Sequence, residues 1–145
     1  MSNTWVLVAE SSRAKIFEVA HPGGALVELE DLAHPASRQH EQEITADLPG
    51  RAYDSQGGQR HKMEEPTSPK HQEAVVFSRE LAERLAAAHG AGAFERLVLV
   101  APPAFLGLVR EQLSVELARC VTDEVAKNLV LHDTNDIRAH LPAHL

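Results

Sequence analysis

Residues 4–9 read TWVLVA, a short apolar run with two valines and a tryptophan. The run is too short for a typical helix, and β-branched and aromatic side chains favour strands. Because its apolar side chains do not alternate with polar ones, both faces of the strand should be buried. We therefore predict a central strand at residues 4–9.

Two more strands are expected directly after this one. Residues 14–20 (AKIFEVA) follow a turn at residues 10–13, and residues 25–32 (ALVELEDL) follow the turn Pro22-Gly23-Gly24. Proline and glycine clusters of this kind mark turns. Strands with such short connections pair antiparallel. The N-terminal part of the chain is thus predicted to be an antiparallel meander.

The clearest helix in the sequence starts at Ser68-Pro69 and ends at Gly90. Serine is a favoured N-cap, proline suits the first helical position, and glycine is common just after a helix. Apolar residues recur in between at helical spacing. Beyond it we expect a strand at 94–101, a helix at about 104–117 opened by Pro102-Pro103, and a strand at 119–131, for which a helix is the alternative. A short helix capped by Asp133 or Thr134 then continues through Ile137 and Leu141.

This order predicts one α/β domain over residues 1–145, with a mixed five-stranded sheet. Strand–helix–strand connections imply parallel pairing in the C-terminal part. Clefts in such folds lie at the carboxyl ends of the parallel strands. Here those ends fall near Ala101-Pro102 and after Leu131.

The composition of the chain limits the classes of function that are possible. The chain has 145 residues, a net charge of −7 and one cysteine, so no internal disulfide is possible. The negative charge argues against a general nucleic-acid coat but leaves room for a local basic site. Cys120 lies in an apolar segment and is expected to be a buried thiol. We find no signal-peptide pattern and no run long enough to span a bilayer, so we expect a cytoplasmic protein without membrane insertion.

One polar stretch stands apart from the predicted elements. It reads LPGRAYDSQGGQRHKMEEPTSPKH over residues 48–71 and shows neither helical nor strand periodicity. A short helix at 39–46 could precede it. Loops of this length inside compact domains are usually functional or disordered. We therefore expect a long functional loop at about residues 48–70.

Four stretches together resemble the bacterial family of host attachment proteins, required for attachment to host cells. They are WVLVAESSRAKIFEV (5–19), PGRAYDSQGGQRHKMEEPTSPKHQE (49–73), FSRELAERL (77–85) and LVLVAPPAFLGLVREQL (97–113). The resemblance covers nearly the whole chain. That family is similar to the middle domain of archaeal and eukaryotic peptide release factors, which implies a ribonuclease-H-like arrangement and a link to the ribosome.

Release factors carry a Gly-Gly-Gln tripeptide that helps water attack the ester of peptidyl-tRNA. The resemblance makes Gly57, Gly58 and Gln59 the catalytic candidates here. Two glycines allow a close backbone approach to RNA, and a backbone N–H can stabilise developing negative charge. The alternative is a chance occurrence in a glycine-rich loop, because Glu64 and Glu65 follow where release factors continue with basic residues.

Basic residues near the loop are candidates for binding RNA. Arginine pairs bidentately with phosphate, which favours Arg13, Arg51 and Arg60, with Lys15 and Lys70 as further members. The resemblance adds His61, next to Arg60, and Lys62 follows it. The alternative is a set of scattered, solvated charges. The predicted RNA-binding residues are Arg13, Arg51, Arg60, His61 and Lys62.

The sequence predicts no metal site and no cofactor. Histidines 34, 40, 61 and 71 follow no metal-ligand spacing and are expected to be solvated. A two-metal nuclease site built from Glu10, Asp31, Asp54 and Asp133 stays open as an alternative, because ribonuclease-H-like folds can host one.

Three hypotheses follow. The first is a domain that acts with ribosomes or tRNA and aids peptidyl-tRNA hydrolysis. The second is a non-enzymatic interaction module behind a host-attachment phenotype. The third is a metal-dependent nuclease. The sequence identifies neither a protein partner nor an oligomeric state.

Overall fold

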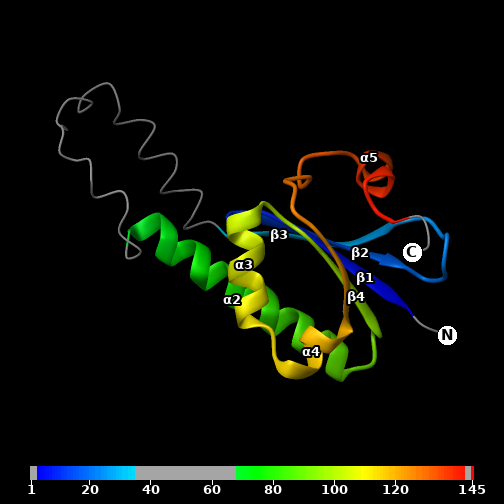
Figure 1. Cartoon of the computed structure of the whole chain (residues 1–145), viewed down its shortest axis with the longest axis horizontal. Coiled ribbons are helices and arrows are strands. Elements are labelled where there is room, and N and C mark those ends of the chain that lie inside the picture. The colour runs from blue at the N-terminus through cyan, green and yellow to red at the C-terminus, as the bar shows by residue number, and fades with distance from the viewer. Residues whose placement is uncertain (1–2, 35–67, 143–144) are drawn as a thin grey trace.

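The computed structural model describes residues 3–34, 68–142 and 145. In these parts of the chain it contains one five-stranded sheet of order β3-β2-β1-β4-β5 (Figure 1). The expected helix at 39–46 lies outside the described residues. The strands are β1 (Thr4–Ala9), β2 (Arg13–Val19), β3 (Val27–Ala33), β4 (Arg96–Val100) and β5 (Val121–Val125).

The sheet is mixed, as predicted. β2 pairs antiparallel with both β1 and β3, so the N-terminal strands form the expected meander. β4 pairs parallel with both β1 and β5. β1 is therefore central, with Val6 opposite Phe17 on one side and Val98 on the other.

Helices cover one face of the sheet, and the C-terminal segment covers the other (Figure 1). The position of β1 between these two layers explains why its sequence is apolar throughout. Trp5 and Leu7 pack in the core under α2, whereas Val6 and Val8 pack in the core under α5. The helices are α2 (Pro69–Gly90), α3 (Pro103–Gln112), α4 (Val115–Cys120) and α5 (Thr134–Ala139).

The start of α2 confirms the prediction, and its end corrects it. Ser68 is the N-cap, and its side chain accepts a hydrogen bond from the His71 backbone N–H. Gly90 is the last helical residue rather than the residue after the helix. The left-handed position is Gly92, with φ +81°, where the Gly92 N–H donates to the His89 carbonyl. Left-handed φ strains residues that carry a Cβ, so glycine suits this position.

The predicted helix at 104–117 is wrong as a single element. α3 ends at Gln112, and Ser114 caps a new helix, α4, by accepting from the Leu117 N–H. α4 then continues to Cys120, which shortens the predicted strand at 119–131 to β5 at 121–125. Leu129 and Val130 are buried in the core under α5 without belonging to a strand.

The remaining differences are small. β2 begins at Arg13, β3 runs to Ala33, and β4 is shorter than predicted. Asp133 is the N-cap of α5, which ends at Ala139 before Leu141. None of the described helices is long and apolar enough to cross a membrane.

Candidate functional site

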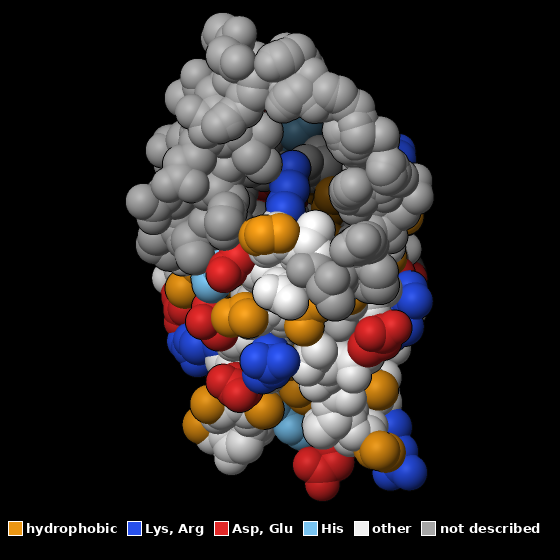
Figure 2. All heavy atoms as spheres, turned by 90° about the vertical axis from the view of Figure 1, so that its left-hand side faces the viewer, with side chains coloured by type: hydrophobic (Ala, Val, Ile, Leu, Met, Phe, Trp, Pro, Cys, Tyr) orange, Lys and Arg blue, Asp and Glu red, His pale blue; other side chains and the backbone are white. Residues whose placement is uncertain are grey.

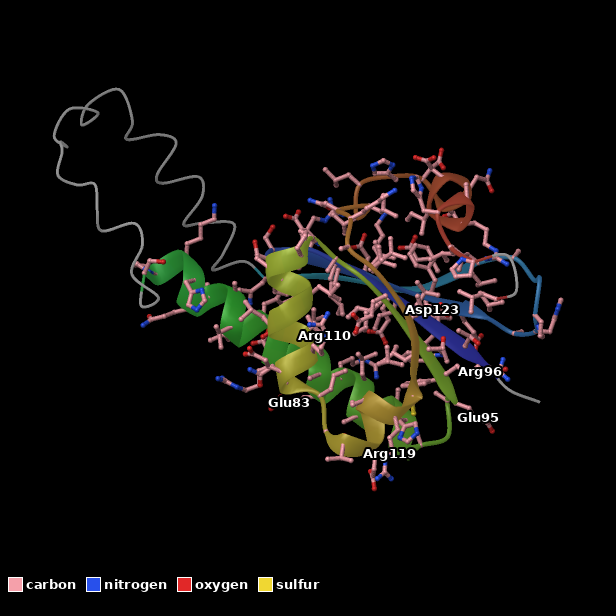
Figure 3. The ribbon with its side chains drawn as sticks, in the orientation of Figure 1. Glu83, Glu95, Arg96, Arg110, Arg119 and Asp123 are labelled. Carbon is pink, nitrogen blue, oxygen red and sulfur yellow. The ribbon has the colours of Figure 1, made fainter. Side chains whose placement is uncertain are left out.

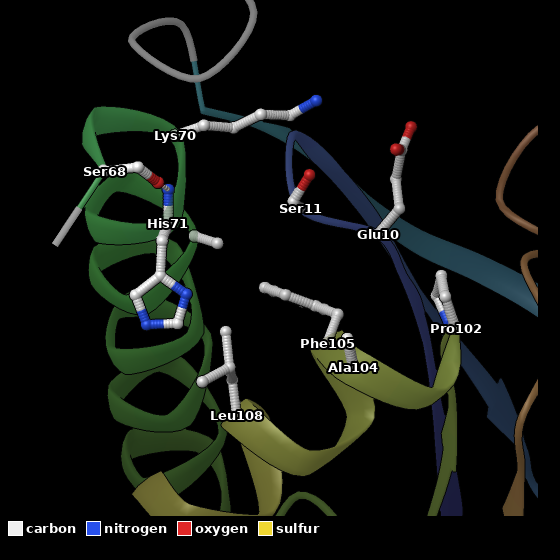
Figure 4. Close-up of a pocket in the computed structure, with 10 residues that line it drawn as sticks. Glu10, Ser11, Ser68, Lys70, His71, Pro102, Ala104, Phe105 and Leu108 are labelled. Atoms are coloured by element: carbon white, nitrogen blue, oxygen red, sulfur yellow. Dashed lines mark hydrogen bonds between the residues drawn. The ribbon is translucent and has the colours of Figure 1, made fainter. Parts of the chain in front are cut away.

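A crevice lies at the carboxyl ends of β1 and β4. It includes Pro102, at one of the two predicted positions, whereas none of its described lining residues follows Leu131, the other predicted position. It encloses about 360 Å³, which falls within the range of small-molecule pockets. The first turns of α2 and α3 form two of its walls (Figure 4). Its lining residues are Glu10, Ser11, Ser68, Lys70, His71, Ala74, Pro102, Ala104, Phe105 and Leu108.

Local sequence sets both helical walls. The Ser68 cap starts α2 so that Lys70 and His71 fall in its first turn. Pro102 and Pro103 end the segment after β4 and start α3, which has no side-chain cap. Phe105 then lies in the core between the two helices, with its ring centroid 6.0 Å from that of Phe77.

Ser68 and His71 do not form a nucleophile–base pair. The Ser68 hydroxyl oxygen lies 3.2 Å from the His71 backbone nitrogen and accepts a hydrogen bond from its N–H. A catalytic serine would instead hydrogen-bond to the imidazole ring. The crevice therefore offers apolar contact, two hydroxyls, a cation and a carboxylate, which are features of a binding site.

His34 corrects the expectation of a solvated histidine. It is buried, and its Nε2 lies 2.7 Å from Glu73 Oε1 while its Nδ1 lies 3.5 Å from Glu80 Oε1. Its ring stacks on Phe77 with 5.3 Å between centroids. The His34 N–H also donates to the Ser12 carbonyl, which fixes the end of β3 beside the turn after β1.

Most predicted site residues lie outside the described residues. Arg13 is the exception. It opens β2, and its guanidinium lies 3.4 Å from the Asp31 carboxylate in β3, so its charge is partly neutralised. The predicted site residues that lie outside the described residues are Arg51, Gly57, Gly58, Gln59, Arg60, His61 and Lys62.

Three of the four carboxylates considered for a nuclease are described, and they form no metal-binding group with other described residues. Glu10 lines the crevice, Asp31 pairs with Arg13, and Asp133 caps α5. Asp54 lies outside the described residues. Among the residues that are described, no group of three His, Cys, Asp or Glu side chains could hold a metal ion.

Charges of both signs are mixed on the face that Figure 2 shows. The view in Figure 2 shows acidic, basic and apolar side chains interspersed below the grey atoms. Figure 3 labels residues of both signs in one region: Glu83, Glu95 and Asp123 together with Arg96, Arg110 and Arg119. Arg110 is itself bound by Glu124, with Arg110 Nη2 2.7 Å from Glu124 Oε1. A nucleic acid would therefore need a local site rather than a broad basic face.

Reasoning from sequence missed the part that Ser11, Phe105 and Leu108 play in the crevice. Ser11 follows a strand end, and such positions were an available signal. Phe105 and Leu108 have helical core spacing and gave no such signal, because a residue that packs in the core and one that lines its open edge share the same pattern.

Comparisons with known proteins agree with the fold. The model of a protein family described as "Protein required for attachment to host cells" matches residues 5–141. The uncharacterised protein RP470 of Rickettsia prowazekii (strain Madrid E) is 39% identical over 44 residues. That match spans 30% of this chain and 29% of the Rickettsia protein.

Two solved archaeal structures are also similar. One is an archaeal translation termination factor, with a TM-score of 0.50 and 14% identity over 86% of this chain and 30% of that protein. The other, described as an archaeal protein, has a TM-score of 0.46 and 14% identity over 86% of this chain and 30% of that one. At such identity, the first match supports the α/β fold alone. The chain spans about a third of the length of the proteins it resembles.

Proposed function

Because this chain belongs to the family of proteins required for attachment to host cells, we propose a function that would underlie that description. We propose that it is a ribosome- or tRNA-associated domain that aids hydrolysis of peptidyl-tRNA. The observation that carries the proposal is the fold shared with a translation termination factor over 86% of the chain. The sequence supports it, because the Gly57-Gly58-Gln59 tripeptide occurs between β3 and α2.

The proposed reaction is ester hydrolysis. Water attacks the carbonyl carbon of the peptidyl ester, the acyl–oxygen bond breaks, and the tRNA 3′-oxygen leaves with a proton. Gln59 would orient the water without titrating, and a backbone N–H near it would stabilise the oxyanion. Gly57 and Gly58 would let the backbone approach the RNA closely. Phosphates would be bound by Arg13, Arg51, Arg60, His61 and Lys62.

The described residues on either side of the segment that carries the tripeptide lie at the same end of the sheet. His34 is held to Ser12 at the turn after β1. Ser68 lines the same crevice as Ser11, one residue before Ser12. The chain therefore leaves β3 and enters α2 at the same end of the sheet, where ligand sites of α/β folds lie.

Peptide release from peptidyl-tRNA on purified bacterial ribosomes tests the proposal. Wild-type protein should release peptide, and Gln59→Ala should lose at least about tenfold in rate, as removal of a positioned polar group does. Gln56→Ala is the matched control, since it removes the same side chain three residues away. If the wild-type protein binds ribosomes but no peptide is released from peptidyl-tRNA, the proposed catalysis is rejected.

A second function has its own support. The family description concerns attachment, and the net charge of −7 suits a protein partner at least as well as RNA. The chain would then be a non-enzymatic interaction module. Capture of one protein partner that survives RNase treatment, with Gln59→Ala silent, would favour this function. The separate positions of the described carboxylates give the nuclease hypothesis no comparable support.

A further inference from the structure

The crevice lies where the sheet topology opens one. β1 and β4 are parallel neighbours, and the chain leaves β1 toward β2 on one side but leaves β4 toward β5 on the other. Connections that diverge in this way leave room between them at the carboxyl ends of the strands. The volume of about 360 Å³ is at the small end of the range for ligand pockets.

The floor of the crevice is apolar and is packed on the core. Ala74 of α2 and Phe105 of α3 are buried members of the core under α2, and Leu108 packs against that core. Figure 4 shows Phe105 and Leu108 together at the lower side of the pocket. Side chains held by a core keep their positions when a ligand leaves, so the floor is preformed for a small apolar group.

The rim carries opposite charges. Lys70 in the first turn of α2 and Glu10 at the end of β1 come from different elements, and Figure 4 shows both side chains at the same side of the pocket, with Ser11 between them. Both side chains also interact within the protein. A ligand would therefore add to those interactions or replace them. An ammonium and a carboxylate on neighbouring walls complement a ligand that carries both charges at one end.

We propose that this crevice binds an apolar α-amino acid such as leucine, methionine or phenylalanine. Its carboxylate would face Lys70 and its ammonium would face Glu10. The side chain, which leaves the same carbon atom, would reach the floor between Phe105 and Leu108. For a ligand of this size, the usual free energy per atom predicts a dissociation constant on the order of 1 mM. The residues of this site do not include the tripeptide, and the proposal does not rest on the proposed hydrolysis.

NMR titration of the full chain with L-leucine tests the proposal. Saturable shifts are expected at the methyl groups of Leu108 and Ala74, both of which line the crevice. Lys70→Ala and Glu10→Gln should each weaken leucine about tenfold, the usual range for one charge-assisted hydrogen bond. Lys127→Ala and Glu83→Gln remove exposed charges elsewhere and are the matched controls.

Two leucine analogues separate the charges. 4-Methylpentanoate lacks the ammonium and leucinamide lacks the carboxylate, so each should bind more weakly than leucine. Glu10→Gln should leave 4-methylpentanoate binding unchanged or tighter. The proposal is overturned if no amino acid shifts the methyl groups of Leu108 and Ala74, or if aspartate or serine binds as well as leucine. It is also overturned if Glu10→Gln weakens leucine and 4-methylpentanoate equally. Equal binding of 4-methylpentanoate and leucine would make this a site for simple organic acids and would also overturn it.

Discussion

At the scale of single residues, Cys120 is held beside a histidine but is not activated. Its Sγ lies 3.4 Å from His89 Nε2, while burial, and next the charge of Glu116, raise the pKa of the thiol. Because the thiolate is the nucleophile, reaction with a disulfide reagent at pH 8 should be several-fold slower than for a cysteine peptide. Unfolding in urea should restore the peptide rate. Glu116→Gln should speed the reaction less than unfolding does. If the folded protein reacts as fast as the peptide or faster, the raised pKa of the Cys120 thiol is contradicted.

Asp136 gives a second prediction at this scale. The hydrogen bond from His132 is the main cause that lowers the pKa of the Asp136 carboxyl, and the charges of His132 and His140 lower it further. Because the folded-state pKa lies below the unfolded one, the stabilising contribution is present above the ordinary Asp pKa and is lost as the pH falls through the lowered value. His132→Ala should therefore raise this pKa toward its usual range. An NMR titration of the carboxyl carbon measures it, with His140→Ala as the smaller change.

At the scale of elements, two glycines near the end of α2 have opposite roles. Gly90 is helical, whereas Gly92 has φ +81°, and a Cβ at either position would meet no heavy atom within 4 Å. Backbone conformation alone should thus decide the outcome. Gly92→Ala should destabilise the protein by about 1–2 kcal/mol, and Gly90→Ala should stabilise it by about 0.5–1 kcal/mol. Urea unfolding measures both, and equal effects would mean that the helix ends elsewhere.

The elements also show how far sequence patterns reach. The start of α2 was predictable because serine and proline act on their own turn. The break between α3 and α4 was missed because apolar spacing continues through Ser114, and its hydroxyl could equally have faced solvent in one long helix. The burial of His34 was missed for a different reason. Its partner Glu73 is 39 residues away, and only the packing of α2 beside β3 brings them together.

At the scale of the whole molecule, topology could be predicted better than the site. The antiparallel meander, the parallel pairing and the cleft position near Pro102 follow from connection lengths and from handed crossovers. The residues that line the crevice could not be predicted in this way, because Lys70 and Glu10 come to the same crevice only after α2 has packed on the sheet. The predicted catalytic residues Gly57, Gly58 and Gln59 lie outside the described residues and remain predictions.

The charge of the whole molecule limits how it would bind a ribosome. With a net charge of −7, binding would depend on the few predicted cations Arg13, Arg51, Arg60 and Lys62. Each phosphate contact contributes about −0.7 to −0.9 to the slope of log K against log salt, so four contacts predict a slope of about −3 to −3.5. Arg13→Ala should reduce it by about 1, while Arg119→Ala on α4 should leave it unchanged. Binding that does not depend on salt concentration would contradict the phosphate contacts. It would favour the interaction module, whose contacts would be with protein.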